Sequence, residues 1–116
     1  MITSYVTPQR SMLYLSLVGA LDARGAEDLV KEYYERYSPT VRRCILDLAD
    51  AEETTEAGLA VIHRLSLVAQ VDGIEFSVVA GGSSSENDIQ MAARRYWVPV
   101  LDARPQPMAA MRGTSY

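Results

Sequence analysis

Two short apolar runs, residues 41–48 and 74–80, constrain the fold of this 116-residue chain more than any other feature of its sequence. In the first run, Cys44-Ile45-Leu46 is apolar at consecutive positions, which is typical of a strand covered on both faces. Segments with apolar residues at helical spacing lie between and beside the two runs. Strands that alternate with helices usually pair in parallel through right-handed crossovers, so the sequence predicts an α/β fold.

Three segments have the apolar spacing of a helix that packs on one side. They are 23–37, 57–71, and a third that follows the turn at 81–85 and runs to about Tyr96. Asp22 is expected to be the N-cap of the first helix, which ends at Ser38-Pro39. Asp72-Gly73 stops the second helix, and the serines at 83–85 are expected to cap the third.

The two ends of the chain add further strands to the predicted sheet. Residues 12–18 alternate between two faces, and the stretch 5–7 before Pro8 is expected to pair with them as an antiparallel edge strand. A short last strand is expected at 98–101, and residues 50–55 form a polar connection to the second helix. The prediction is a mixed sheet, with an antiparallel opening hairpin followed by parallel strands and with helices packed against it.

The length and composition predict a single domain. Apolar residues make up 48% of the chain, which is enough for one compact core. A length of 116 residues leaves no room for a second domain. The domain is expected to span 1–112, with a last helical turn or two near 108–111 and a frayed tail at 113–116.

Composition also restricts the partners and the compartment. The net charge is −4 and no basic stripe is present, so we expect no nucleic-acid partner. The lone Cys44 cannot form an internal disulfide and the first residues lack the blocks of a signal peptide, which indicates the cytoplasm. Arg, Asp or Glu interrupts every apolar stretch before the roughly 20 residues that a membrane span requires, so no membrane insertion is expected.

The side chains that could carry catalysis are scattered. They are His63, Cys44, Asp47, Asp50, Glu52, Glu53 and Glu56. His63 has no second ligand at metal-binding spacing, and Cys44 is expected to be an inert packing residue in a central strand. Gly81-Gly82 lacks the lysine of a phosphate-binding loop and is interpreted as a turn. We therefore expect no enzyme, no metal and no cofactor.

The most informative segment is 46–62, where a buried strand leads to the start of a helix. The first-turn amides of a helix are unpaired and carry partial positive charge, so this connection could hold a carboxylate or receive a phosphate that a partner recognises. Glu53 and Glu56 could equally be ordinary first-turn acids, with Thr54 or Thr55 as the cap. The residues alone favour this second, structural interpretation.

Three segments, in this order, resemble the STAS domain over almost the whole chain. They are Val18-Gly19-Ala20-Leu21-Asp22-Ala23, Ile45-Leu46-Asp47-Leu48 and Ala57-Gly58-Leu59-Ala60. The STAS family includes bacterial anti-sigma factor antagonists, stressosome components and cytoplasmic domains of anion transporters. The resemblance implies a non-catalytic regulatory protein of the antagonist type. The partner-binding residues that it implies are Asp22, Thr54, Thr55, Glu56, Ala57, Gly58, Leu59 and Ile62.

The position before the glycine departs from the antagonist pattern. In the antagonists a Ser or Thr stands there and is phosphorylated by a partner-switching kinase, whereas this chain has Ala57. Thr54 and Thr55 keep a hydroxyl nearby and are the candidate phosphoacceptors. Glu56 carries one negative charge, less than the roughly −1.5 to −2 of a phosphate.

The resemblance implies two alternative functions. In the first, partner switching in transcription regulation, the connection and second helix dock on an anti-sigma factor or a serine kinase-like protein and free a sigma factor. This hypothesis predicts that Gly58→Trp abolishes docking. In the second, the chain is a scaffold with other STAS-like chains or a small cytoplasmic subunit of a lipid-transport ATPase, since Ala before the glycine is similar to those subunits.

Overall fold

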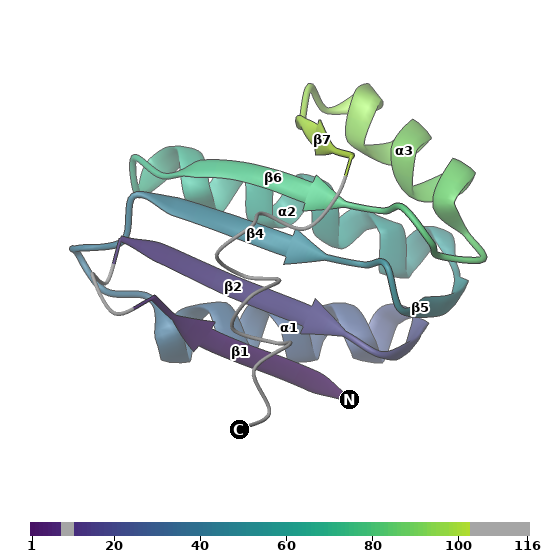
Figure 1. The fold of residues 1–116 in the computed structure, drawn as a ribbon, viewed down its shortest axis with the longest axis horizontal. Helices are drawn as coiled ribbons and strands as arrows, with labels where there is room; N and C mark the ends of the chain where they lie inside the picture. The colour runs from purple at the N-terminus through teal and green to yellow at the C-terminus, as the bar shows by residue number, and fades with distance from the viewer. Residues whose placement is uncertain (8–10, 103–116) are drawn as a thin grey trace.

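A five-stranded mixed sheet forms the centre of the molecule in the computed structural model, which describes residues 1–7 and 11–102 (Figure 1). Its strands are β1 (Ile2–Val6), β2 (Met12–Leu17), β4 (Arg43–Asp47), β6 (Glu75–Val79) and β7 (Val100–Leu101), in the order β1-β2-β4-β6-β7. The β1–β2 pair is antiparallel and the other pairs are parallel. The predicted mixed sheet with an antiparallel opening hairpin is therefore confirmed.

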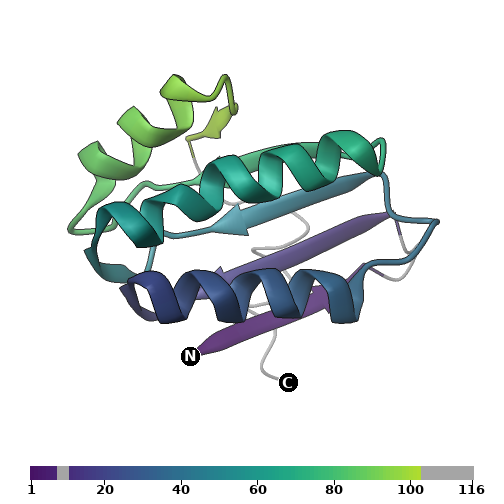
Figure 2. The same cartoon turned by 180° about the vertical axis from the view of Figure 1, so that it is seen from behind.

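Helices cover one face of this sheet. They are α1 (Ala23–Arg36), α2 (Glu56–Val71) and α3 (Glu86–Arg95). Figure 2 shows α1 and α2 lying side by side across the sheet, with α3 at its β7 edge. The parallel register sets Leu13 beside Cys44 and Leu15 beside Leu46, and these side chains are fully buried in one core with Leu29 of α1 and with Ile62 and Leu65 of α2.

The other face of the sheet is also buried at its centre. Tyr14, Ile45 and Val79 form a second apolar cluster there, and each is at most 1% exposed. Alternate residues of a strand point to opposite faces, so Cys44 and Leu46 face the helices while Ile45 faces away from them. The prediction of a central strand covered on both faces is confirmed.

A second, two-stranded sheet was not expected from the sequence. It pairs β3 (Gly19–Leu21) in parallel with β5 (Ala51–Thr54), whereas residues 50–55 were expected to be a polar connection. Gly19 has φ of 109° and turns the chain after β2, and its N–H donates to the carbonyl of Asp50 at 3.3 Å. The polar side chains of β5 gave no sign of a strand in the sequence. The β3–β5 pairing depends instead on backbone groups from two distant segments.

The remaining differences concern the ends of elements. β1 begins at Ile2, three residues earlier than expected, and α2 begins one residue earlier, at Glu56. The helical turn expected near 108–111 and the tail expected at 113–116 lie outside the described residues. Within the described residues, no helix combines the length and the apolar character that crossing a bilayer requires.

Candidate partner-binding site

The predicted binding segment lies where β5 leads into α2, beyond the carboxyl ends of β2 and β4 (Figure 1). Thr55 is the N-cap of α2, since its Oγ1 accepts a hydrogen bond from the Gly58 N–H at 3.0 Å. The Thr55 carbonyl accepts from the Leu59 N–H at 2.8 Å and begins the helix. Of the two threonines considered for this cap, Thr55 is the one that makes it.

The starts of α1 and α2 are joined to each other. Asp22 caps α1 as expected, with its Oδ1 accepting from the Gly25 N–H at 2.8 Å. The residue before it, Leu21, accepts a hydrogen bond from the Thr55 N–H at 3.1 Å. One short backbone segment therefore holds the first turns of both helices, and the exposed start of α2 rests on a rigid support.

Gly58 allows this close approach. A Cβ atom at Gly58 would lie 1.8 Å from the Leu21 carbonyl oxygen and 2.8 Å from the Asp22 nitrogen. Such a contact is far inside van der Waals distance, so no side chain fits at position 58 without moving backbone. Gly58 is buried and Ile62 is 0% exposed, so neither offers a side chain at the surface of this structure.

This burial corrects two expectations from the sequence. Gly58 and Ile62 support the site from inside, because the first packs against the β3–α1 junction and the second lies in the main core. The variant Gly58→Trp would disrupt that packing and so could not report on docking alone.

The exposed part of the segment is Thr55, Glu56 and Ala57, with Thr54 and Leu59 half-buried behind it. Beside it a groove of about 490 Å³ runs between α2 and α3. Its lining combines carboxylates, one guanidinium and apolar side chains: Thr54, Thr55, Glu56, Leu59, Ala60, Asp88, Met91, Ala92, Arg95 and Tyr96. The structure thus brings half of the predicted residues into one groove, namely Thr54, Thr55, Glu56 and Leu59, while Asp22 serves as a cap outside it.

The α3 side of the groove was missed in the sequence. Asp88, Met91 and Arg95 follow one another at spacings of three and four, which places them on one helix face. Met91 is 61% exposed although it is apolar. An apolar residue on a face that otherwise carries Asp and Arg was the signal that could have identified this wall.

The serines at 83–85 fix the position of α3, and they do so in an unexpected way. Ser85 occupies the N-cap position but makes no side-chain cap, so the predicted capping is wrong. The Ser83 hydroxyl donates to the Ala51 carbonyl at 2.8 Å, and the Ser85 hydroxyl donates to the Glu52 carbonyl at 3.2 Å. These hydroxyls satisfy the outer backbone of β5 and tie the start of α3 to the binding segment.

The residues considered for catalysis have structural surroundings. His63 of α2 stacks on Tyr96, with ring centroids 4.0 Å apart and planes 3° apart, and so joins α2 to the end of α3. Cys44 is fully buried, and burial raises the pKa of its thiol to about 12. In the described part of the chain, no three His, Cys, Asp or Glu side chains gather as metal ligands would.

Comparison with known proteins gives a structural match. No family model matches the sequence, and no curated protein matches it. Among solved structures, the anti-sigma factor antagonist SpoIIAA in its unphosphorylated form superposes with a TM-score of 0.63. The match covers 97% of this chain and 99% of that chain, with 10% identical residues. This chain has the SpoIIAA fold.

The SpoIIAA fold confirms the STAS-like architecture that the three sequence segments implied. At 10% identity the likeness to SpoIIAA concerns the path of the chain and not the side chains. The chemistry of the α2–α3 groove therefore has to be judged from its own residues.

Proposed function

We propose that this chain is a non-catalytic, cytoplasmic regulatory module that binds an anti-sigma factor or a serine kinase-like partner. One observation carries the proposal: the start of α2 is held by the Thr55 cap, and the exposed residues Thr55 and Glu56 there line the α2–α3 groove. The SpoIIAA fold supports it, because the structure that shares this fold is an anti-sigma factor antagonist.

The groove suggests what the partner presents. Leu59 and Met91 offer apolar surface on facing helices, and Glu56 and Asp88 add two carboxylates. An apolar side chain inserted between α2 and α3, flanked by a lysine or arginine, would complement this lining. The partner surface is therefore expected to be apolar and basic.

Phosphorylation in this chain is proposed to occur at Thr55, and not at the position immediately before Gly58, where the antagonists carry a Ser or Thr. Ala57 has no hydroxyl, and Thr54 is half-buried in β5, whereas Thr55 is exposed. A phosphate on Thr55 would stand at the start of α2, where unpaired amides favour negative charge. Its added charge beside Glu56 and Asp88 would change what the groove binds.

The test is purification of the tagged protein from its native cells under mild lysis, followed by mass spectrometry and by binding measurements with the recovered partner. Recovery of an ATP-binding anti-sigma protein supports the proposal. We expect Met91→Ala, which truncates an apolar wall of the groove, to weaken its binding at least about tenfold. Glu56→Arg should weaken it as well, since it would repel a basic partner surface. Gln70→Arg, an exposed change near the far end of α2, should leave binding unchanged and serves as the control.

The alternative function is a small subunit of a lipid-transport ATPase or a scaffold with other STAS-like chains. The observation that favours it is Ala57, which removes the hydroxyl that covalent switching would need at that position. Stoichiometric recovery of a nucleotide-binding transport subunit in the same purification would establish this alternative and end the sigma-factor proposal. Equal partner binding by Glu56→Arg, Met91→Ala and wild type would instead move the docking surface away from the α2–α3 groove.

A further inference from the structure

In the part of the chain that the structure describes, the edge of the sheet opposite α3 is not paired with another strand. β1 is the outermost strand, and in residues 1–7 and 11–102 no strand pairs with its outer side. Met1 and Thr7 hydrogen-bond with β2 through their backbone groups, so alternation directs the N–H and C=O groups of Ile2, Ser4 and Val6 outward. Between Ile2 and Val6 there is no proline, lysine or bulge, the usual devices that keep edge strands from pairing.

A row of alternating charge runs along α1 beside this edge. Arg24, Asp28, Lys31 and Glu35 follow at spacings of four, three and four, and so lie on one helix face. All four side chains are exposed. The two ion pairs that the described residues form, Arg36 with Glu32 and Arg64 with Glu27, use none of them.

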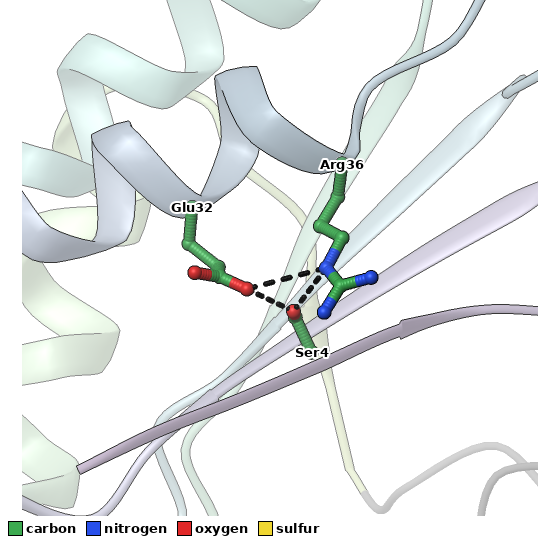
Figure 3. Close-up of polar contacts among 3 residues, drawn as sticks. All are labelled: Ser4, Glu32 and Arg36. Carbon is green, nitrogen blue, oxygen red and sulfur yellow. Dashed lines mark hydrogen bonds and ion pairs between the residues drawn. The ribbon is translucent and has the colours of Figure 1, made fainter.

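The same four residues line a hollow of about 400 Å³ next to the β1 edge, together with Met1 and Ile2. Further along β1, Figure 3 shows how α1 is attached to the strand. The Ser4 hydroxyl donates to Glu32, and the Arg36 Nε lies 3.1 Å from Ser4 Oγ and 3.3 Å from Glu32 Oε2. These contacts fix the position of α1 relative to β1, so the charged row and the outer edge of β1 form one surface.

We propose that this surface, β1 with the α1 row, is an interface between two copies of the chain, which pair antiparallel about a two-fold axis. The order of the charges along α1 is complementary to the same row on a second copy of the chain. A two-fold axis midway along the row places Arg24 opposite Glu35 of the second copy and Asp28 opposite its Lys31, so all four facing pairs have opposite charge.

The spacing of the elements fits the same axis. α1 contacts both β1 and β2, and added strands lie about 4.8 Å apart, so a second copy joined at β1 brings the two α1 helices to about 10 Å. That is the ordinary distance of helices in contact. Ile2 lines the hollow with Asp28 and Lys31, so the axis passes through both the strand and the charged row.

This inference goes beyond the proposed function and is independent of it. α3, which forms one wall of the α2–α3 groove, lies at the β7 edge of the sheet, opposite β1 (Figures 1 and 2). A dimer formed at β1 would therefore present two grooves to its partners. Loss of partner binding with the dimer intact, or the reverse, separates the two proposals.

The experiment is sedimentation velocity of the full chain over a wide concentration range at low and high salt. We expect a monomer–dimer equilibrium that salt weakens. Lys31→Glu should weaken the dimer about tenfold, since it turns two symmetric attractions into repulsions, and the charge swap Asp28→Lys/Lys31→Glu should restore it. Arg94→Glu, the same type of reversal on exposed α3, should leave the equilibrium unchanged.

A second pair of variants tests the strand. Ile2→Pro removes the outward N–H that lies at the proposed axis and costs no bond to β2, so it should give a folded monomer by circular dichroism. Ile2→Ala keeps that N–H and should keep the dimer. A wild type that stays monomeric at all concentrations, a swap that fails to restore what Lys31→Glu lost, or an Ile2→Pro dimer of wild-type strength would each overturn the proposal.

Discussion

At the residue scale, Gly58 shows how one missing side chain determines the geometry of the candidate site. Its backbone lies so close to the Leu21 carbonyl that the first turn of α2 and the β3–α1 junction form a single unit. The adjoining residue, Ala57, is exposed and has no such restriction. The glycine is thus explained by packing, whereas packing places no such restriction on the residue before it.

We predict that Gly58→Ala destabilises the protein by about 3 kcal/mol or more, because the added methyl would lie 1.8 Å from the Leu21 oxygen. Urea denaturation measures the loss. Gly73→Ala is the control: its φ is +71° but the space around it is open, so the cost should be about 1 kcal/mol. Similar losses for the two variants would contradict the close contact at Gly58.

A second residue-scale feature is the link between Tyr33 of α1 and Asp72 at the end of α2. The Tyr33 hydroxyl donates to Asp72 Oδ2 at 2.7 Å. Burial, followed by the hydrogen bond to Asp72, raises the pKa of Tyr33. The phenol is therefore held neutral in the folded protein to a higher pH than in the unfolded chain.

Alkaline pH should consequently destabilise the wild type. The unfolded chain releases the Tyr33 proton near pH 10 while the folded protein retains it, so stability falls as the pH rises above that value. Tyr33→Phe should be less stable by about 1 kcal/mol at neutral pH but should lose less stability above pH 10. Urea denaturation at a series of pH values compares the two, and parallel pH profiles would refute the raised pKa.

At the element scale, the start of α2 depends on its cap. We predict that Thr55→Ala costs about 1 kcal/mol, since it removes the oxygen that accepts from the Gly58 N–H. Thr55→Ser keeps that oxygen and should retain most of the stability. Thermal or urea denaturation of the two variants provides the measurement, and an alanine variant as stable as the serine variant would show that the cap contributes nothing.

The position of α3 is likewise an element-scale property. Its N-terminus is attached through serine hydroxyls to the carbonyls of β5, and its C-terminus through the stack of Tyr96 on His63. The groove between α2 and α3 therefore has both ends fixed. A groove held in this way would not need to rearrange before a partner binds it.

At the scale of the whole molecule, Cys44 reports on the integrity of the sheet. It lies in the central strand β4, is 0% exposed, and has a thiol pKa raised to about 12 by burial. We predict that a thiol reagent labels it only when the sheet opens, at a rate that rises with urea as global unfolding does. In Ala57→Cys one thiol should react at once and Cys44 should stay protected, whereas rapid labelling of both would mean that the sheet opens locally.

The sequence by itself determined the order and type of the main elements, because apolar periodicity is a local property. Consecutive apolar residues at Cys44-Ile45-Leu46 predicted a central strand, and the spacing through 57–71 predicted α2. The cap Asp22 was also predicted, and the cap of α2 was narrowed to Thr54 or Thr55, since a cap depends on residues within one helical turn.

Only the tertiary structure decided what the candidate site is made of. The β3–β5 pair, the burial of Gly58 and Ile62, and the α3 wall of the groove all arise from contacts between segments far apart in the chain. Such contacts depend on how β3, α2 and α3 are packed, and local patterns carry no information about distances between distant residues. The sequence could therefore indicate the candidate segment, whereas the lining of the groove, and the position of the charged row beside β1, follow from the fold.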